Sequence, residues 1–371
     1  MRALAAILAM SCGSASSAPS PAVTPSPAPA ATASPTKQLV GDPAAAGRII
    51  ATQVVAAVDD APASDRPAYA RADQHVTLYA VIVADVAGKR VIYSDAPALR
   101  LAGKPVATQP LAKAPALALR WNKIEPAVAS MTNGDTPGEF HFAAIDYRAT
   151  PLPAAADHGS LAADVHPTLT PDHGAGVGTM RFQIIATQGE RTIASAGPDA
   201  RRGKGSGGLT DAVLRVSIRR DDSYLGYLTE LFGQPYIWAS AGLSDATHES
   251  ERLEGADCAD FVVYGVRRMG QRVKYTWTGG LPEITTLLGA GTHGDDGVYR
   301  DARGKPLPFT RAGDLVLFPR HVGVLSVDRG QRGVLDDQDL MMHALFDTPK
   351  EQAIADSGYA ETPVELRRLG R

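Results

Sequence analysis

The sequence predicts two folded regions of different class, an all-β region followed by an α+β region. Across residues 65–219, apolar and polar residues alternate, as at Leu214, Val216 and Ile218, and no helical pattern intervenes. Such alternation is typical of half-exposed antiparallel strands. In residues 220–371, helical patterns come first and strand patterns follow. We therefore expect a β-sandwich or barrel-like domain before an α+β domain.

Length and composition limit the class of protein. The chain has 371 residues, of which 44% are hydrophobic and 21% charged, as in globular proteins of more than one domain. Its net charge is −3 and its pI about 6.3, whereas nucleic-acid-binding domains are usually basic. After the first residues, no apolar run is long enough to cross a membrane. We therefore expect no nucleic-acid partner.

The N-terminus has the pattern of an exported protein. Residues 1–12 combine one arginine, a short apolar core and Cys12; they resemble a lipoprotein signal, in which the cysteine carries the lipid. An ordinary secretory leader with an incidental Cys12 is the alternative. Residues 13–41 are rich in Ser, Ala and Pro, a composition that stays unfolded and spaces a domain from its anchor. These features predict a location in the bacterial cell envelope, in the periplasm or at a membrane through a lipid on Cys12.

A helix is expected next, over residues 42–64. Asp42-Pro43 is a suitable helix start, and Ile50, Val54 and Val58 recur at intervals of four. The region 65–219 that follows contains no recognisable catalytic or metal-binding motif, so its role stays open.

The stretch 255–270 holds Cys258 at the start of a second predicted helix. Asp257 is suited to cap this helix, Asp260 adds charge to its first turn, and Gly270 ends it. We expect the helix dipole to lower the pKa of the thiol and favour a nucleophilic thiolate. A buried structural cysteine is the alternative. If Cys12 is lipidated or removed, Cys258 has no disulfide partner, and a lone thiol in an exported protein favours a chemical role.

Two histidines could complete a nucleophilic site. Residues 312–328 read as a β-hairpin whose return strand opens at His321, and His343 lies within a predicted strand at 340–346. Acyl transfer by a thiol uses an imidazole that accepts the thiol proton and a polar residue that orients the imidazole. Alternatively, His321 is a surface residue of the hairpin, and His343 is a core residue whose hydrogen bonds are satisfied within the fold.

The order of these motifs resembles the NlpC-type papain-like cysteine peptidases, which cut bacterial cell-wall peptides. The resemblance covers about the last 150 residues, the size of one domain. It is carried by PYIWAS (235–240), Asp257-Cys258, Gly313-Asp314-Leu315, His321-Val322-Gly323 and His343-Ala344. It implies a papain-like α+β domain over residues 220–371, with the nucleophile on a helix and the histidine on a sheet.

The resemblance also implies roles for single residues. Cys258 would be the nucleophile, His321 the general base and His343 the residue that orients it. Tyr236 and Asp257 would bind substrate, although they could equally be a core aromatic residue and a helix cap. Ala259-Asp260 stands where the family usually has Ser-Gly, and two loops are longer than in the family.

The function implied is a cysteine endopeptidase that cuts peptidoglycan stem peptides at the γ-D-glutamyl–diaminopimelate bond. A related Cys–His amidase acting on another amide or ester, and a non-catalytic wall-associated lipoprotein, stay open. No metal or organic cofactor is implied. The expected partners are stem peptides and, through Cys12 alone, a membrane; we expect a monomer.

Overall fold

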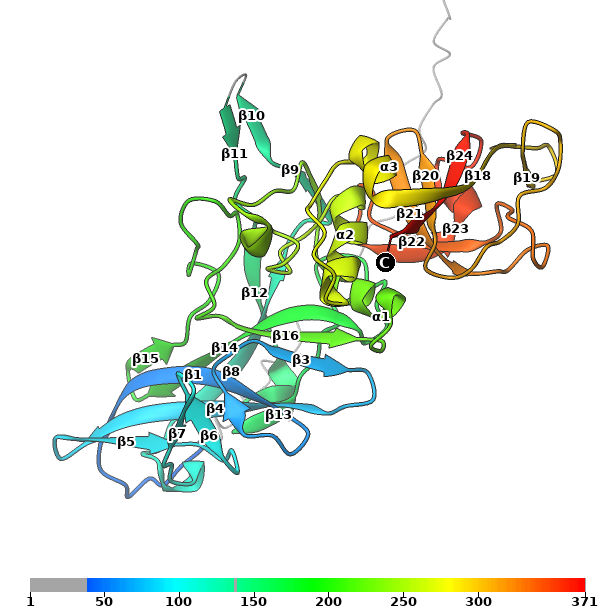
Figure 1. The fold of residues 1–371 in the computed structure, drawn as a ribbon. Helices are drawn as coiled ribbons and strands as arrows, with labels where there is room; N and C mark the ends of the chain where they lie inside the picture. Colours follow the sequence, from blue (N-terminus) through cyan, green and yellow to red (C-terminus); the bar gives the residue numbers. More distant parts are fainter. Residues whose placement is uncertain (1–38, 137–138, 371) are drawn as a thin grey trace, which may run out of the picture. The chain divides into compact units, whose positions relative to one another are not determined.

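Strands dominate the fold, which the computed structural model describes for residues 39–136 and 139–370 (Figure 1). The protein is 41% strand and 12% helix, and two of its sheets are curled. Its α-helices are short: α1 (Tyr224–Leu228), α2 (Cys258–Arg268) and α3 (Leu281–Ile284). The expected α+β class with a papain-like C-terminal fold is therefore wrong, and the protein is mostly β. The leader, Cys12 and nearly all of the 13–41 linker lie outside the described residues.

One predicted helix is a strand, and another is shorter than predicted. The segment 42–64 contains β1 (Arg48–Val58), which pairs along its length with β4 (Val76–Val86). Ile50, Val54 and Val58 recur every four residues, which is also a multiple of the strand period of two, and β-branched residues favour strands. A short helix is also predicted at 282–288, from the apolar spacing of Ile284, Leu287 and Leu288. The observed helix, α3, is only four residues long, and Thr285 begins β18 (Thr285–His293).

Two sheets share the core of the N-terminal half. Their facing apolar side chains include Leu78, Ile82, Trp121, Phe182 and Val216, all buried. The first sheet contains β1, β2 (Ala63–Ser64), β4, β5 (Lys89–Tyr93), β6 (Leu99–Leu101), β7 (Lys104–Val106) and β13 (Ser160–Ala162). The second contains β3 (Ala68–Arg71), β8 (Ala118–Pro126), β12 (Tyr147–Pro151), β14 (Gly178–Gln188), β15 (Arg191–Ala194) and β16 (Leu214–Arg219). Short 3₁₀ turns lie at Leu111–Lys113 and Pro153–Ala155.

A third sheet carries the C-terminal half. In spatial order its strands are β19 (Tyr299–Arg300), β18, β24 (Val364–Leu369), β20 (Leu315–Phe318), β21 (His321–Val327), β22 (Leu340–His343) and β23 (Lys350–Ala353). One face packs on α1 and α2 through residues such as Leu315, Val322 and Val324. The other face packs on residues such as Tyr299, Leu335 and Ile354. The expected hairpin at 312–328 is confirmed by the β20–β21 pair.

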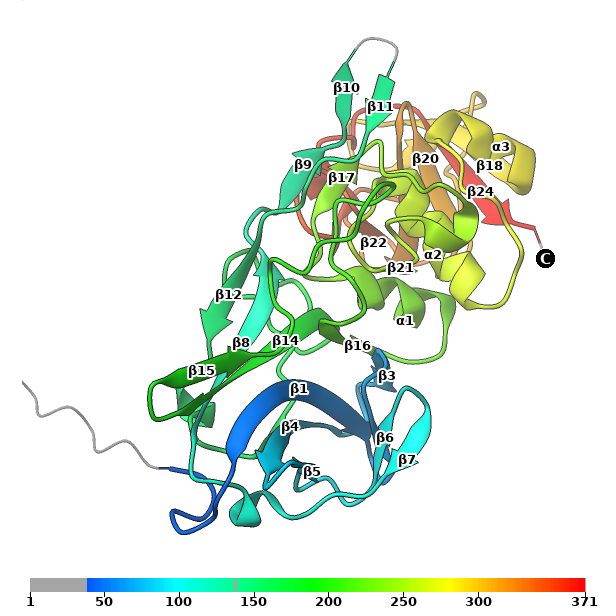
Figure 2. The same ribbon diagram turned by 90° about the vertical axis from the view of Figure 1, so that its left-hand side faces the viewer.

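Strands also connect the two halves of the chain. β9 (Ser130–Thr132) pairs with β17 (Tyr236–Trp238), and the β10–β11 hairpin (Gly134–Thr136 and Glu139–His141) continues from β9 (Figure 2). The Asn133 side chain donates to Glu249 Oε2 (2.9 Å) and to the Ala239 carbonyl oxygen (3.0 Å). Further 3₁₀ turns lie at Thr229–Leu231, Asp245–Thr247, Thr278–Gly280 and Ile354–Ser357. None of the helices in the described ranges is both long and apolar enough to cross a membrane.

Candidate active site

Cys258 is the first residue of α2, and the cap of this helix leaves its backbone N–H free. The side chain of Asp257 caps the helix, as expected, by accepting hydrogen bonds from the N–H groups of Ala259 and Asp260, both at 2.9 Å. Within the described ranges, the Cys258 N–H has no hydrogen-bond acceptor. It is therefore available to stabilise an oxyanion formed next to the sulfur.

Packing fixes α2 against the third sheet. Phe261, Val262 and Val263 are fully buried, and the helix packs on β21 and β22. Gly265 allows α1 to approach closely, because a Cβ atom there would lie 2.7 Å from the side chains of Leu228 and Tyr224. The start of the helix is therefore held in place by its own core contacts.

His321 is the first residue of β21 and is fully buried. Its ring contacts two aromatic rings, that of Phe318, with centroids 6.0 Å apart, and that of Tyr359, with centroids 4.7 Å apart; these two rings also contact each other, at 5.6 Å. Tyr359 was not predicted, because nothing in its surrounding sequence indicates a contact with a residue on β21. The two rings restrict how the imidazole can turn.

His343 ends β22 and contacts His321 directly. His321 Nε2 and His343 Nδ1 are 2.9 Å apart, and both residues are at most 1% exposed. Among the described residues, His321 Nδ1 and His343 Nε2 have no hydrogen-bond partner. If His321 Nε2 donates this hydrogen bond, Nδ1 keeps its lone pair and can accept a proton.

The thiol of Cys258 lies beside the same hairpin. The backbone N–H of Val322, the residue after His321, interacts with the thiol and lowers its pKa. No hydrogen bond joins the thiol to His321 itself. The structure thus brings His321 and His343 into contact with each other. It places the Cys258 thiol beside Val322, the residue that follows His321 in β21. In free enzymes, catalytic hydrogen bonds are often long and tighten when substrate binds.

Burial sets the charge state of this group. It raises the pKa of Cys258 well above that of a free thiol, and Asp257 raises it further. The expected lowering by the helix dipole is therefore wrong, because desolvation of a thiol that is 5% exposed outweighs it. Burial and the neighbouring His343 lower the pKa of His321, and burial lowers the pKa of His343 to about 3. At neutral pH the group consists of a thiol and two neutral imidazoles.

The two predicted substrate-binding residues lie next to Cys258. Tyr236, on β17, is 1% exposed and packs edge-on against Phe346 at 5.4 Å. Burial raises its pKa, and Cys258 and Asp257 add to the effect. Burial raises the pKa of Asp257 to about 6. Asp257 thus caps the helix and also lines a cavity.

This acidic cavity has a volume of about 440 Å³. Its lining includes Asp260, which is 4% exposed and accepts a hydrogen bond of 2.5 Å from Ser240 Oγ. His248 Nε2 lies 3.5 Å from Asp260 Oδ2, and its ring stacks on Tyr275 at 3.7 Å. The complete lining is Phe140, Ala239, Ser240, Ala241, Gly242, Ser244, Asp245, His248, Asp257, Asp260, Tyr275, Thr276 and Trp277.

The acidic cavity was not predicted as a unit. Ser240 ends the PYIWAS motif and His248 begins the HESERLE stretch, but no local signal indicates that both reach the same carboxyl group. Within the described part of the chain, no cluster of three or more His, Cys, Asp or Glu side chains is arranged to hold a metal ion.

Comparison of the chain with protein-family models, with curated proteins and with solved structures finds no match. The geometry described above therefore carries the functional argument.

Proposed function

We propose that the protein hydrolyses an amide bond through an acyl-enzyme on Cys258. The observation that carries this proposal is the 2.9 Å hydrogen bond between His321 and His343 beside the Cys258 thiol. His321 acts as the general base, and His343 holds it in the tautomer with the proton on Nε2.

The steps follow from the neutral resting state. As Cys258 Sγ attacks the substrate carbonyl carbon, its proton passes to His321 Nδ1, and the carbonyl oxygen becomes an oxyanion that the Cys258 N–H stabilises. The oxyanion collapses, the C–N bond breaks, and His321 gives the proton to the leaving amine. A thioester results. Water then attacks the thioester with His321 again as base, which releases a carboxylic acid and restores the thiol.

The substrate we propose is a peptidoglycan stem peptide, cut between D-glutamate and diaminopimelate. The similarity of the motifs to NlpC-type peptidases supports this choice, and the acidic cavity supports it independently. Asp245 and Asp257 line that cavity beside Asp260, and burial raises the pKa of Asp260 well above its ordinary value. The carboxylates of Asp245 and Asp257 therefore suit the cationic amino end of a short peptide. An exported protein, with a lipid on Cys12 as its anchor, would meet this substrate in the cell envelope.

The test uses wild type, Cys258→Ala and a control, Met269→Ala, which truncates an exposed residue at the end of the same helix. Each is incubated with defined muropeptides under reducing conditions, and the products are identified by mass spectrometry. We expect cleavage after D-glutamate by wild type and control, and none by Cys258→Ala. Cleavage at another bond would indicate the related amidase. Absence of cleavage by folded wild type would refute the catalytic proposal.

A further inference from the structure

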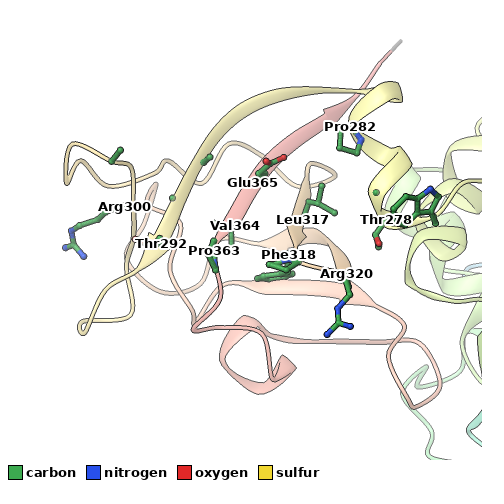
Figure 3. A pocket seen from close by; sticks show the side chains of 16 residues that line it. Thr278, Pro282, Thr292, Arg300, Leu317, Phe318, Arg320, Pro363, Val364 and Glu365 are labelled. Carbon is green, nitrogen blue, oxygen red and sulfur yellow. The ribbon is translucent and has the colours of Figure 1, made fainter.

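A second cavity, of about 580 Å³, lies beside the turn that leads into His321 (Figure 3). It is bounded by β18, by the start of β24 and by the turn between β20 and β21. Apolar side chains of Leu317, Phe318, Pro363 and Val364 lie between Arg300 and Arg320 (Figure 3). We refer to it as the turn cavity.

Three charged residues line the turn cavity, and two of them are already paired. Arg300 donates to both carboxylate oxygens of Asp296, at 2.6 and 2.7 Å, and Glu365 accepts from Arg367 at 2.6 Å. Arg320 has no ion pair with any residue in the described ranges. Among the residues that the structure describes, the cavity wall therefore carries one uncompensated charge, and it is positive.

The backbone at Arg320 is unusual for an arginine. Pro319 and Arg320 form the two-residue turn between β20 and β21, and Arg320 has φ = +66°. Glycine or asparagine is normally favoured at such a position. Strained residues of this kind cluster at functional sites. Ala87 and Ala102 also have positive φ in hairpin turns of this chain, so the functional interest of Arg320 lies in its position on the cavity wall.

The turn cavity also adjoins the reacting group. Phe318 lines the cavity and stacks on the His321 ring, while Arg320 is bonded to His321 in the chain. Trp277, 73% exposed, lines both this cavity and the acidic cavity at Asp257. The two cavities therefore share Trp277 in their linings; one is acidic and the other has an unpaired arginine.

We propose that the turn cavity binds the leaving-group side of the substrate, and that Arg320 binds a free carboxylate there. This inference rests on the proposed function, in which His321 protonates the leaving amine, so the leaving group must lie beside the residues that flank His321. The substrate class is a short peptide with a cationic amino end on the acyl side and an anionic leaving group. Arg320 then selects for the charge of that leaving group.

Two matched substrates test this selection: L-Ala-γ-D-Glu-diaminopimelate and the same peptide with both diaminopimelate carboxylates converted to amides. For wild type we expect kcat/KM to be roughly 5- to 30-fold higher for the free acid, as one partly desolvated charged pair would give. Arg320→Ala should lose this preference through a higher KM for the acid and leave the amide unchanged. Arg303→Ala, an exposed arginine outside the cavity lining, is the control.

A binding measurement separates failure of this inference from failure of the proposed function. Free diaminopimelate is titrated calorimetrically into wild type, Arg320→Ala and Arg303→Ala, with no turnover required. Weaker binding by Arg320→Ala alone would support the carboxylate site even if neither peptide were cut. Equal binding by all three proteins, or an Arg320→Ala enzyme that still prefers the free acid, would overturn the inference.

Discussion

Replacing His343 gives the sharpest test of the mechanism. His343 Nδ1 is the hydrogen-bond partner of His321 Nε2, and both rings are almost fully buried. His343→Ala would leave the Nε2 proton of the productive tautomer without an acceptor. An unpaired buried donor costs about 1–3 kcal/mol. Because 1.4 kcal/mol corresponds to a factor of ten, we expect kcat/KM to fall by roughly 5- to 150-fold.

His343→Asn separates this role from simple packing. The Asn Oδ1 atom can occupy nearly the position of His Nδ1 and accept the same hydrogen bond. We therefore expect His343→Asn to retain most of the activity that His343→Ala loses. Met342→Leu, a volume-conserving change at the next buried residue, controls for disturbance of β22.

The assay is muropeptide cleavage followed by mass spectrometry, with a pH profile for each variant and thermal unfolding as a check of folding. The pKa of His343 is lowered to about 3, so its protonation should not shape the profile above pH 5. Wild-type kcat/KM in His343→Ala would refute the reasoning. So would an asparagine variant that is folded but no more active than the alanine variant.

Three other predictions concern the same region. Iodoacetamide should alkylate Cys258 slowly at pH 7 and faster as pH rises, because burial raises its pKa; a rate that levels off below pH 7 would contradict this. Burial lowers the pKa of His248 to about 3, so below about pH 6.5 the unfolded chain binds a proton at this residue that the folded chain does not. The free energy of unfolding should therefore fall, by at most ~5 kcal/mol, as pH falls from about 6.5 toward 3. His248→Gln should therefore reduce the drop in melting temperature between pH 7 and pH 4, and an unchanged drop would count against it. Arg268→Met should lower the free energy of unfolding in urea by about 2–4 kcal/mol, because it leaves the fully buried Glu230 without its bidentate partner at 2.7 and 2.9 Å. Arg272 is exposed and unpaired within the described ranges, so Arg272→Met should change stability little. Equal effects of the two substitutions would argue against a stabilising role for the Arg268–Glu230 pair.

Local features of the site could be predicted from the sequence because their signals lie within a few residues. The cap at Asp257 and the β20–β21 hairpin were predicted from short patterns, and both are present. A pattern that repeats every four residues was less informative, because it fits a helix and a strand alike. β1 is therefore a strand, paired with β4. The α+β class predicted for residues 220–371 is wrong for a different reason, because strands dominate there and the helices are short.

Long-range features could not be predicted in the same way. The direction of the Cys258 pKa shift depends on how deeply the thiol is buried, which no local pattern gives. Likewise, Tyr359 stacks on His321 across 38 residues, and Ser240 and His248 meet at Asp260 only after folding. These contacts depend on tertiary packing, and they determine which protonation states the site can hold.

The N-terminal half of the chain takes part in building the site. β17, which carries Tyr236, is paired with β9 in its sheet, so its position depends on a strand from the other half. Asn133 then holds Glu249 at the loop that supplies His248 to the acidic cavity. An isolated three-residue strand has too few hydrogen bonds of its own to fix a side chain. The geometry around Tyr236 therefore requires both halves, although Cys258, His321 and His343 all come from one.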